Sequence, residues 1–197
     1  MKRTPPSRPK IGPSGRITGA ATIATLASPV RQEIIDTVEA LGGAATIAAI
    51  AEALGRPADG LYYHARQLVA AGLLASTRGT FRTPRARGAL TLDYRPDDPR
   101  TASAVRDVIA GMLRIARRDF DAGLATPGVV VSGPRRALWA GRTKGWVGAR
   151  ELVEINAMIR RIQRLLRRPR RRAGDQLASW CFVLAPIAPR PPRRGSW

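Results

Sequence analysis

The sequence predicts an α+β fold that is mainly helical, with a small amount of β-structure. Apolar residues recur at helical spacing in five segments, and glycine- or proline-containing breaks separate these segments. Short runs rich in threonine, valine and aromatic residues follow the third and fourth segments, as expected of strands. With 197 residues and 44% hydrophobic composition, the chain can bury a substantial core.

The first two predicted helices are short and clearly bounded. Ser28 can cap the first helix, and Pro29 suits its first position, where a missing N–H costs little. Its inner stripe consists of Val30, Ile34, Val38 and Leu41. The pair Gly42-Gly43 ends it, after which Thr46 can cap a second helix that stops at Gly55.

The third predicted helix runs from about residue 58 to residue 71. Leu61, Ala65 and Leu68 share one face at helical spacing and are expected to face the core. This spacing turns the residues between them towards the other faces. Tyr62 and Tyr63 lie about 100° apart around the helix, so we expect one ring to be exposed and the other partly buried.

A two-stranded hairpin is predicted after the third helix. Residues 73–77 and 80–83 form the two strands, and Arg78-Gly79 forms the turn between them. Residues 89–94 are a further candidate strand. The segment Arg95-Pro96-Asp97-Asp98-Pro99 then breaks the pattern and is the predicted domain boundary.

Three helices followed by a hairpin form a winged helix-turn-helix. The residue pattern of this segment resembles that of the ArsR-like winged-helix regulators, in the branch that lacks metal-binding cysteines. The resemblance covers about residues 20–83. The residues that carry it are Ser28-Pro29-Val30-Arg31, Ala53-Leu54-Gly55, Tyr63-His64 and Ala71-Gly72-Leu73.

The resemblance implies a sequence-specific transcriptional regulator that binds double-stranded DNA as a homodimer. The helix at about 58–71 would enter the major groove, and the wing at about 73–83 would contact the backbone. The implied DNA-binding residues are Thr46, Asp59, Tyr62, Tyr63, Arg66, Arg78 and Arg82. Pro57-Ala58-Asp59-Gly60 stands where the family usually has Ser or Thr, which leaves Asp59 as the candidate cap.

The charge of the chain favours a polyanionic partner. Its formal net charge is +20, and such an imbalance is typical of nucleic-acid-binding proteins. Residues 66–87, which include the wing, contain five arginines and no acidic residue. The densest run of arginines lies at 160–172, and it is either a contact to flanking DNA or a solvated, solubilising face.

Neither a cofactor nor an enzymatic activity is predicted. His64 is the one histidine and Cys181 the one cysteine, so one chain cannot assemble a Cys/His metal cluster or an internal disulfide. We expect His64 to be structural or to contact phosphate, and Cys181 to be buried. Apolar runs stay well short of the ~20 residues of a membrane helix. These features favour a cytoplasmic protein.

The C-terminal half is predicted to be an α+β region for dimerisation or effector binding. Helices are expected at about 101–122 and 149–168, and strands at 129–131, 137–140, 144–147 and 177–184. The first of these helices is the candidate dimer seam, through Val105, Ile109, Met112 and Phe120. Trp139, Trp146 and Trp180 are expected to fill the core of the sheet or, as an alternative, to line a pocket for an effector.

The predicted organisation has four parts. Residues 1–18 form a flexible basic arm, 19–94 the winged helix-turn-helix, 95–188 the C-terminal region and 189–197 a flexible tail. One alternative function remains open. The arginine-rich C-terminal half would suit a sequence-independent binder of RNA or of the nucleoid.

Overall fold

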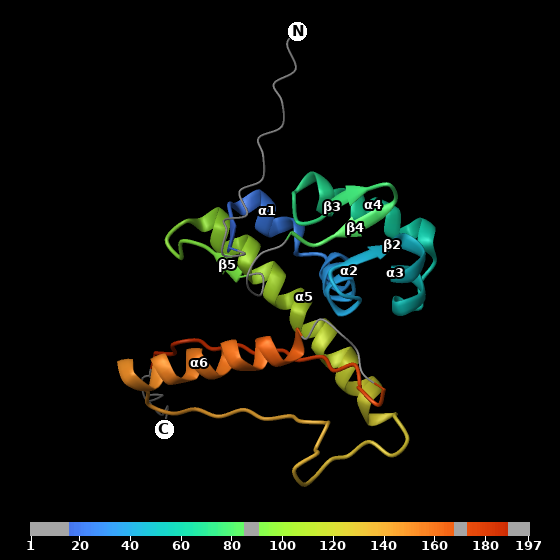
Figure 1. The fold of residues 1–197 in the computed structure, drawn as a ribbon. Helices are drawn as coiled ribbons and strands as arrows, with labels where there is room; N and C mark the ends of the chain where they lie inside the picture. The colour runs from blue at the N-terminus through green and yellow to red at the C-terminus, as the bar shows by residue number, and fades with distance from the viewer. Residues whose placement is uncertain (1–15, 85–90, 168–172, 189–197) are drawn as a thin grey trace, which may run out of the picture.

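The structure is a computed structural model that describes residues 16–84, 91–167 and 173–188 (Figure 1). Most of the predicted basic arm and the whole predicted tail lie outside these residues. Five strands and six helices occur in the described chain. They are β1 (Arg16–Thr18), α1 (Ala20–Thr25), α2 (Pro29–Ala40), β2 (Ala44–Thr46), α3 (Ile47–Leu54), α4 (Ala58–Ala70), β3 (Ala75–Thr77), β4 (Thr80–Arg82), β5 (Thr91–Asp93), α5 (Pro99–Leu124) and α6 (Ala149–Leu166).

The predicted helix-turn-helix and wing are confirmed, and so is the α+β fold class. The Thr46 hydroxyl accepts a hydrogen bond of 3.2 Å from the Ala49 amide and so caps α3. Gly55 adopts the left-handed conformation (φ 59°) that ends α3 and turns the chain towards α4. The hairpin of β3 and β4 gains a third strand, because β2 pairs antiparallel with β4.

Strand β2 and helix α1 were not predicted. β2 is Ala-Ala-Thr, which has little strand propensity of its own. It forms because it pairs with the Phe81 strand, and Phe81 is buried there. β1 lies within the predicted arm and pairs in parallel with β5, which was predicted. Each of these elements depends on partners that are distant in the sequence.

One hydrophobic core holds the N-terminal half together. Ile34 and Val38 of α2, Ile50 of α3 and Leu68 of α4 are fully buried in it. Val105 and Val108 bring the first half of α5 into the same core. Burial of each such side chain contributes about 1.5–3 kcal/mol. The winged helix-turn-helix therefore rests on α5 as well as on its own helices.

The C-terminal half is organised differently. In Figure 1, α5 is a long rod that runs from the winged helix-turn-helix towards α6, at the other end of the molecule. Among the described residues, no hydrophobic side chain after Val108 belongs to the buried core. α6 buries none of its residues. Residues 173–188 run beside α6 as an extended segment (Figure 1).

The strands predicted beyond residue 94 are wrong for the part of the chain that the structure describes. Residues 129–131, 137–140, 144–147 and 177–184 are not in strands. A strand needs a partner for its backbone groups, and Pro127, Pro134 and Pro186 flank these short runs and limit their extension. Trp146 is 94% exposed instead of filling a sheet. Cys181 is half-buried, and burial raises the pKa of its thiol.

The predicted dimer seam needs a correction. Val105 is buried in the intramolecular core, and Ile109 packs against that core. Neither side chain is available to a second chain. Met112 and Phe120 lie further along α5 and are half-buried. The apolar stripe of α5 was predicted correctly, but α1 and α2 cover its first half, which therefore packs within one molecule.

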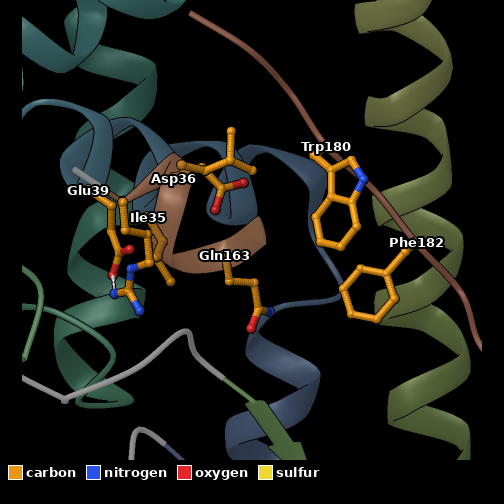
Figure 2. Close-up of a pocket in the computed structure, with 8 residues that line it drawn as sticks. Ile35, Asp36, Glu39, Gln163, Trp180 and Phe182 are labelled. Atoms are coloured by element: carbon orange, nitrogen blue, oxygen red, sulfur yellow. Dashed lines mark hydrogen bonds and ion pairs between the residues drawn. The ribbon is translucent and has the colours of Figure 1, made fainter. Parts of the chain in front are cut away.

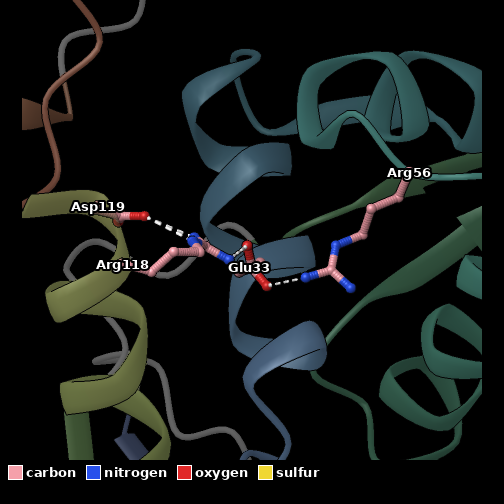
Figure 3. A network of polar contacts seen from close by, with 4 residues as sticks. All are labelled: Glu33, Arg56, Arg118 and Asp119. Atoms are coloured by element: carbon pink, nitrogen blue, oxygen red, sulfur yellow. Dashed lines mark hydrogen bonds and ion pairs between the residues drawn. The ribbon is translucent and has the colours of Figure 1, made fainter. Parts of the chain in front are cut away.

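A buried carboxylate links α2, α5 and the turn between α3 and α4 (Figure 3). Glu33 of α2 is 7% exposed and accepts hydrogen bonds from Arg118 of α5 (2.5 Å) and Arg56 (3.2 Å). Arg118 also pairs with Asp119 at 2.6 Å. Arg56 lies in the turn between α3 and α4. The position of that turn is therefore tied, through Glu33, to α5.

We expect Arg118→Met to lower the free energy of unfolding by about 1–2 kcal/mol, because it removes one of the two partners of a buried charge. The full cost of breaking a buried pair is reduced here, since Arg118 is itself half-exposed. Urea denaturation measures the change.

Arg117→Met is the matched control. Arg117 pairs with Asp121 on the exposed face of the same helix, and its loss should change stability by less than about 0.5 kcal/mol. Equal effects of the two substitutions would contradict the structural role of the Glu33 network.

Candidate nucleic-acid interface

Helix α4 has a buried face and a free face. Leu61, Ala65 and Leu68 are buried against α2 and α3, as the spacing predicted. The opposite side is exposed over the whole length of the helix. The exposed residues are Asp59, Gly60, Tyr62, Tyr63, Arg66, Gln67 and Ala70. This face combines hydrogen-bond donors and acceptors with aromatic surface, which is the chemistry that reads base edges and phosphates.

Both tyrosines of α4 are exposed, so the expectation that one would be partly buried is wrong. Tyr62 is 48% exposed and Tyr63 is 63% exposed. The inner stripe at 61, 65 and 68 already fills the space between α4 and its neighbours, and neither tyrosine falls on it. The exposed edge of Tyr63 stands against His64 in a T-shaped contact with ring centroids 5.5 Å apart.

The side chain of His64 is half-buried and uncharged. It is half-buried beside the inner stripe, and among the described residues its buried Nδ1 has no hydrogen-bond partner. Burial, followed by the positive charges of Arg31 and Arg56, lowers the pKa of the imidazole. His64 is therefore neutral at pH 7 and contributes no charge to an anion site.

Two side chains at helix starts face solvent. Thr46 is exposed at the N-terminus of α3, where it already caps the helix through its oxygen. Its hydroxyl hydrogen can still be donated, and a helix N-terminus attracts phosphate. Pro57, not Asp59, occupies the cap position of α4. Asp59 lies in the first turn, where a negative charge is favourable to the helix dipole.

The wing ends in a tight turn with an arginine at its tip. Arg78 (φ 48°) and Gly79 (φ 76°) both adopt positive φ values between the paired residues Thr77 and Thr80. A two-residue hairpin of this twist favours Asn or Gly at the first position, and an arginine there costs about 1 kcal/mol. The turn therefore holds the Arg78 side chain at the exposed tip of the hairpin at some cost in backbone strain.

The predicted residues lie on two neighbouring parts of one unit. Asp59, Tyr62, Tyr63 and Arg66 share the free face of α4, and Arg78 and Arg82 are exposed on the hairpin that follows. Thr46 stands apart from both groups in sequence, but its strand pairs with the wing at Thr80. The hairpin and the helix are held together by Leu73 and Leu74, which are buried directly after α4.

Sequence reasoning missed two residues. Gln67 is exposed on the free face of α4, one turn after Tyr63, and its amide can pair with the edge of adenine. The helical spacing could have identified it. Arg56 was assigned no role, but its ion pair with Glu33 fixes the turn that leads into α4. Arg56 and Glu33 are far apart in the sequence, and only the fold brings them together.

The comparisons with known proteins agree with this geometry. Residues 26–77 match the family described as helix-turn-helix domain, and this range includes α2, α3, α4 and the first strand of the wing. No curated protein and no solved structure matches the chain. Within residues 16–84, 91–167 and 173–188, no helix is both long and apolar enough to span a membrane. Residues 26–77 therefore form a helix-turn-helix domain, the kind of unit found in DNA-binding regulators.

Proposed function

We propose that the protein is a sequence-specific DNA-binding transcriptional regulator that acts as a homodimer. The observation that carries this proposal is the free face of α4. It is polar, aromatic and exposed, and it lies next to an arginine-tipped wing within a helix-turn-helix domain. The resemblance to ArsR-like regulators supports the same reading. Such a regulator acts where the genome is, so we place it in the cytoplasm.

The proposed contacts divide into two kinds. Arg66, with Tyr62, Tyr63 and Asp59, would meet base edges and nearby phosphates in the major groove. Thr46, Arg78 and Arg82 would contact the backbone, which positions the domain without reading sequence.

The exposed apolar side chains of the C-terminal half support a dimer. Phe120 of α5 falls on one helical face with Leu113 and Leu124, which are largely exposed, and half-buried Met112 lies beside this face. Side chains of this kind gain about 1.5–3 kcal/mol each when they are buried. A second copy would cover this face and would also present two recognition helices to two half-sites. The seam therefore lies on the second half of α5.

A second candidate function is supported by α6. Arg160, Arg161 and Arg164 are exposed on it, and a sequence-independent nucleic-acid binder could use such a row of charges. Selection from a pool of random duplexes, at two salt concentrations, separates the two functions. An enriched motif, with two related half-sites, supports the regulator. Binding without enrichment would support the second candidate and contradict the first.

We expect Arg66→Ala to weaken binding to a selected site more than binding to random DNA, because a bidentate guanine contact contributes about 1–3 kcal/mol of discrimination. Fluorescence anisotropy with both duplexes measures the two affinities. Equal losses on both would contradict base reading by this residue.

Arg78→Asn should act differently. Asparagine suits the left-handed position, so the hairpin is relieved of strain and the domain should be at least as stable as before. Loss of the guanidinium should nevertheless weaken binding to selected and random DNA alike, and it should reduce the dependence on salt by about one phosphate contact. An unchanged salt dependence would exclude Arg78 from the interface.

The dimer seam is tested with Leu124→Glu. We expect the unaltered chain to have twice the 21.3 kDa mass of one chain in light scattering, and the variant to have the single mass, because a charge cannot be buried unpaired at the seam. Ala122→Glu, on another exposed face of α5, should leave the dimer intact. A monomeric unaltered chain would contradict the proposal.

A further inference from the structure

A cavity of about 230 Å³ lies between α2, α6 and the extended C-terminal segment (Figure 2). Ile35, Asp36 and Glu39 of α2 form one wall, and Gln163 of α6 forms the floor in this view. Trp180 and Phe182 of the C-terminal segment form the facing wall. Their rings are stacked, with centroids 4.7 Å apart. Arg167 also lines the cavity, where it pairs with Glu39, so the cavity joins a partly neutralised acidic wall to an aromatic one.

Helix α2 carries three acidic residues in this region, of which Asp36 and Glu39 line the cavity. Glu33, Asp36 and Glu39 follow one another along α2 at intervals of three residues. Glu33 is paired with Arg56 and Arg118, and Glu39 is paired with Arg167 at 2.6 Å. Among the residues that the structure describes, no basic side chain forms an ion pair with Asp36. It is the one carboxylate of the three that faces the cavity without a counter-charge.

The surroundings of Asp36 disfavour its negative charge. The loss of hydration inside the cavity, followed by repulsion from Glu39, Glu33 and Asp119, raises its pKa to about 6. The side chain of Asp36 remains accessible to solvent, so a ligand can reach its carboxylate. At pH 7 the group is ionised, and a cation beside it would relieve the repulsion.

We propose that this cavity binds a small organic cation, such as an alkylated or aromatic ammonium group. The ammonium would lie against the Asp36 carboxylate, and its apolar substituents would contact the rings of Trp180 and Phe182. Aromatic faces attract cations, and the attraction is strongest for tryptophan. An inorganic cation would gain little from the aromatic wall, and an anion would be repelled by α2.

This site goes beyond the proposed function and does not depend on it. The cavity is formed by α2, α6 and the C-terminal segment, and none of the residues proposed to contact DNA lines it. It is nevertheless on the same helix as Glu33, whose ion pair holds the turn before α4.

The direct test is a titration of the full chain with benzyltrimethylammonium, followed by ligand-observed NMR at constant ionic strength. Benzyl alcohol, which is neutral, and benzoate, which is an anion, serve as matched probes. We expect saturable binding of the cation at pH 7.5 and at least tenfold weaker binding of the other two.

Two substitutions locate the site. Asp36→Asn should weaken cation binding about tenfold, and Trp180→Leu, which keeps an apolar side chain but removes the indole, should weaken it several-fold. Asp121→Asn removes an exposed acid of α5 and is the control that should bind as before. Asp36→Asn removes a repelled charge, so the variant should fold, and thermal melting checks this.

The pH dependence follows from the charge of Asp36. The charged groups near it are Glu33 and Glu39 of α2, Asp119 of α5, and Arg167, which directly follows α6; Arg118 is bound to Glu33. Below pH 6 the carboxyl gains a proton and loses its attraction for a cation. Binding should therefore weaken about tenfold between pH 7.5 and pH 5, and this change should be absent in Asp36→Asn.

Three results would overturn the proposal: no saturable binding of the cation, equal binding of the neutral probe, or an unchanged affinity in Asp36→Asn. DNA binding by the same variants separates this failure from failure of the proposed function. Loss of the cation site with normal DNA affinity would leave the regulator intact. Normal cation binding without any DNA binding would contradict only the regulator.

Discussion

The packing of α4 constrains the rest of the structure. Leu61, Ala65 and Leu68 must face α2 and α3 to complete the core. Helical geometry then directs the side chains of the residues between them away from the core. Two tyrosines and an arginine are thereby held on the solvent side of a rigid helix. The domain is stabilised by one face of α4 and offers the other face to a partner. In the proposed function, stability and DNA recognition are thus divided between two sides of the same thirteen residues.

Charge and core are distributed unevenly along the chain. The N-terminal half buries its apolar residues around α2 and uses Glu33 to fix the α3–α4 turn against α5. The second half of α5 and the whole of α6 leave apolar side chains exposed. A chain that exposes so much apolar surface on one half gains free energy by covering it. In the proposed function, the winged helix-turn-helix that packs on the first half of α5 contacts DNA, and the second half of α5 contacts a second subunit.

Local signals in the sequence were sufficient for the helix-turn-helix and the wing. Pro29 at the first position of α2, the Thr46 cap, the Gly55 stop and the stripe of α4 all act within a few residues, whereas Ser28 occupies the cap position of α2 without a side-chain hydrogen bond. β1 and β2 could not be predicted, because their pairing partners lie far along the chain. The runs at 129–131 and 177–184 have strand-like composition but find no partner strand in the described structure. Of the candidate site, the exposed face was predictable, whereas the Glu33 network and the Asp36 cavity needed the fold.

The most direct test of the central claim is an arginine footprint of the full chain on a selected duplex. Phenylglyoxal modifies accessible arginines, and mass spectrometry reports which of them DNA protects. We expect DNA to protect Arg66, Arg78 and Arg82 from phenylglyoxal, since all three are exposed in the free protein. Arg117 and Arg150 should remain reactive. Protection confined to Arg160, Arg161 and Arg164, with Arg66 as reactive as in free protein, would contradict the central claim.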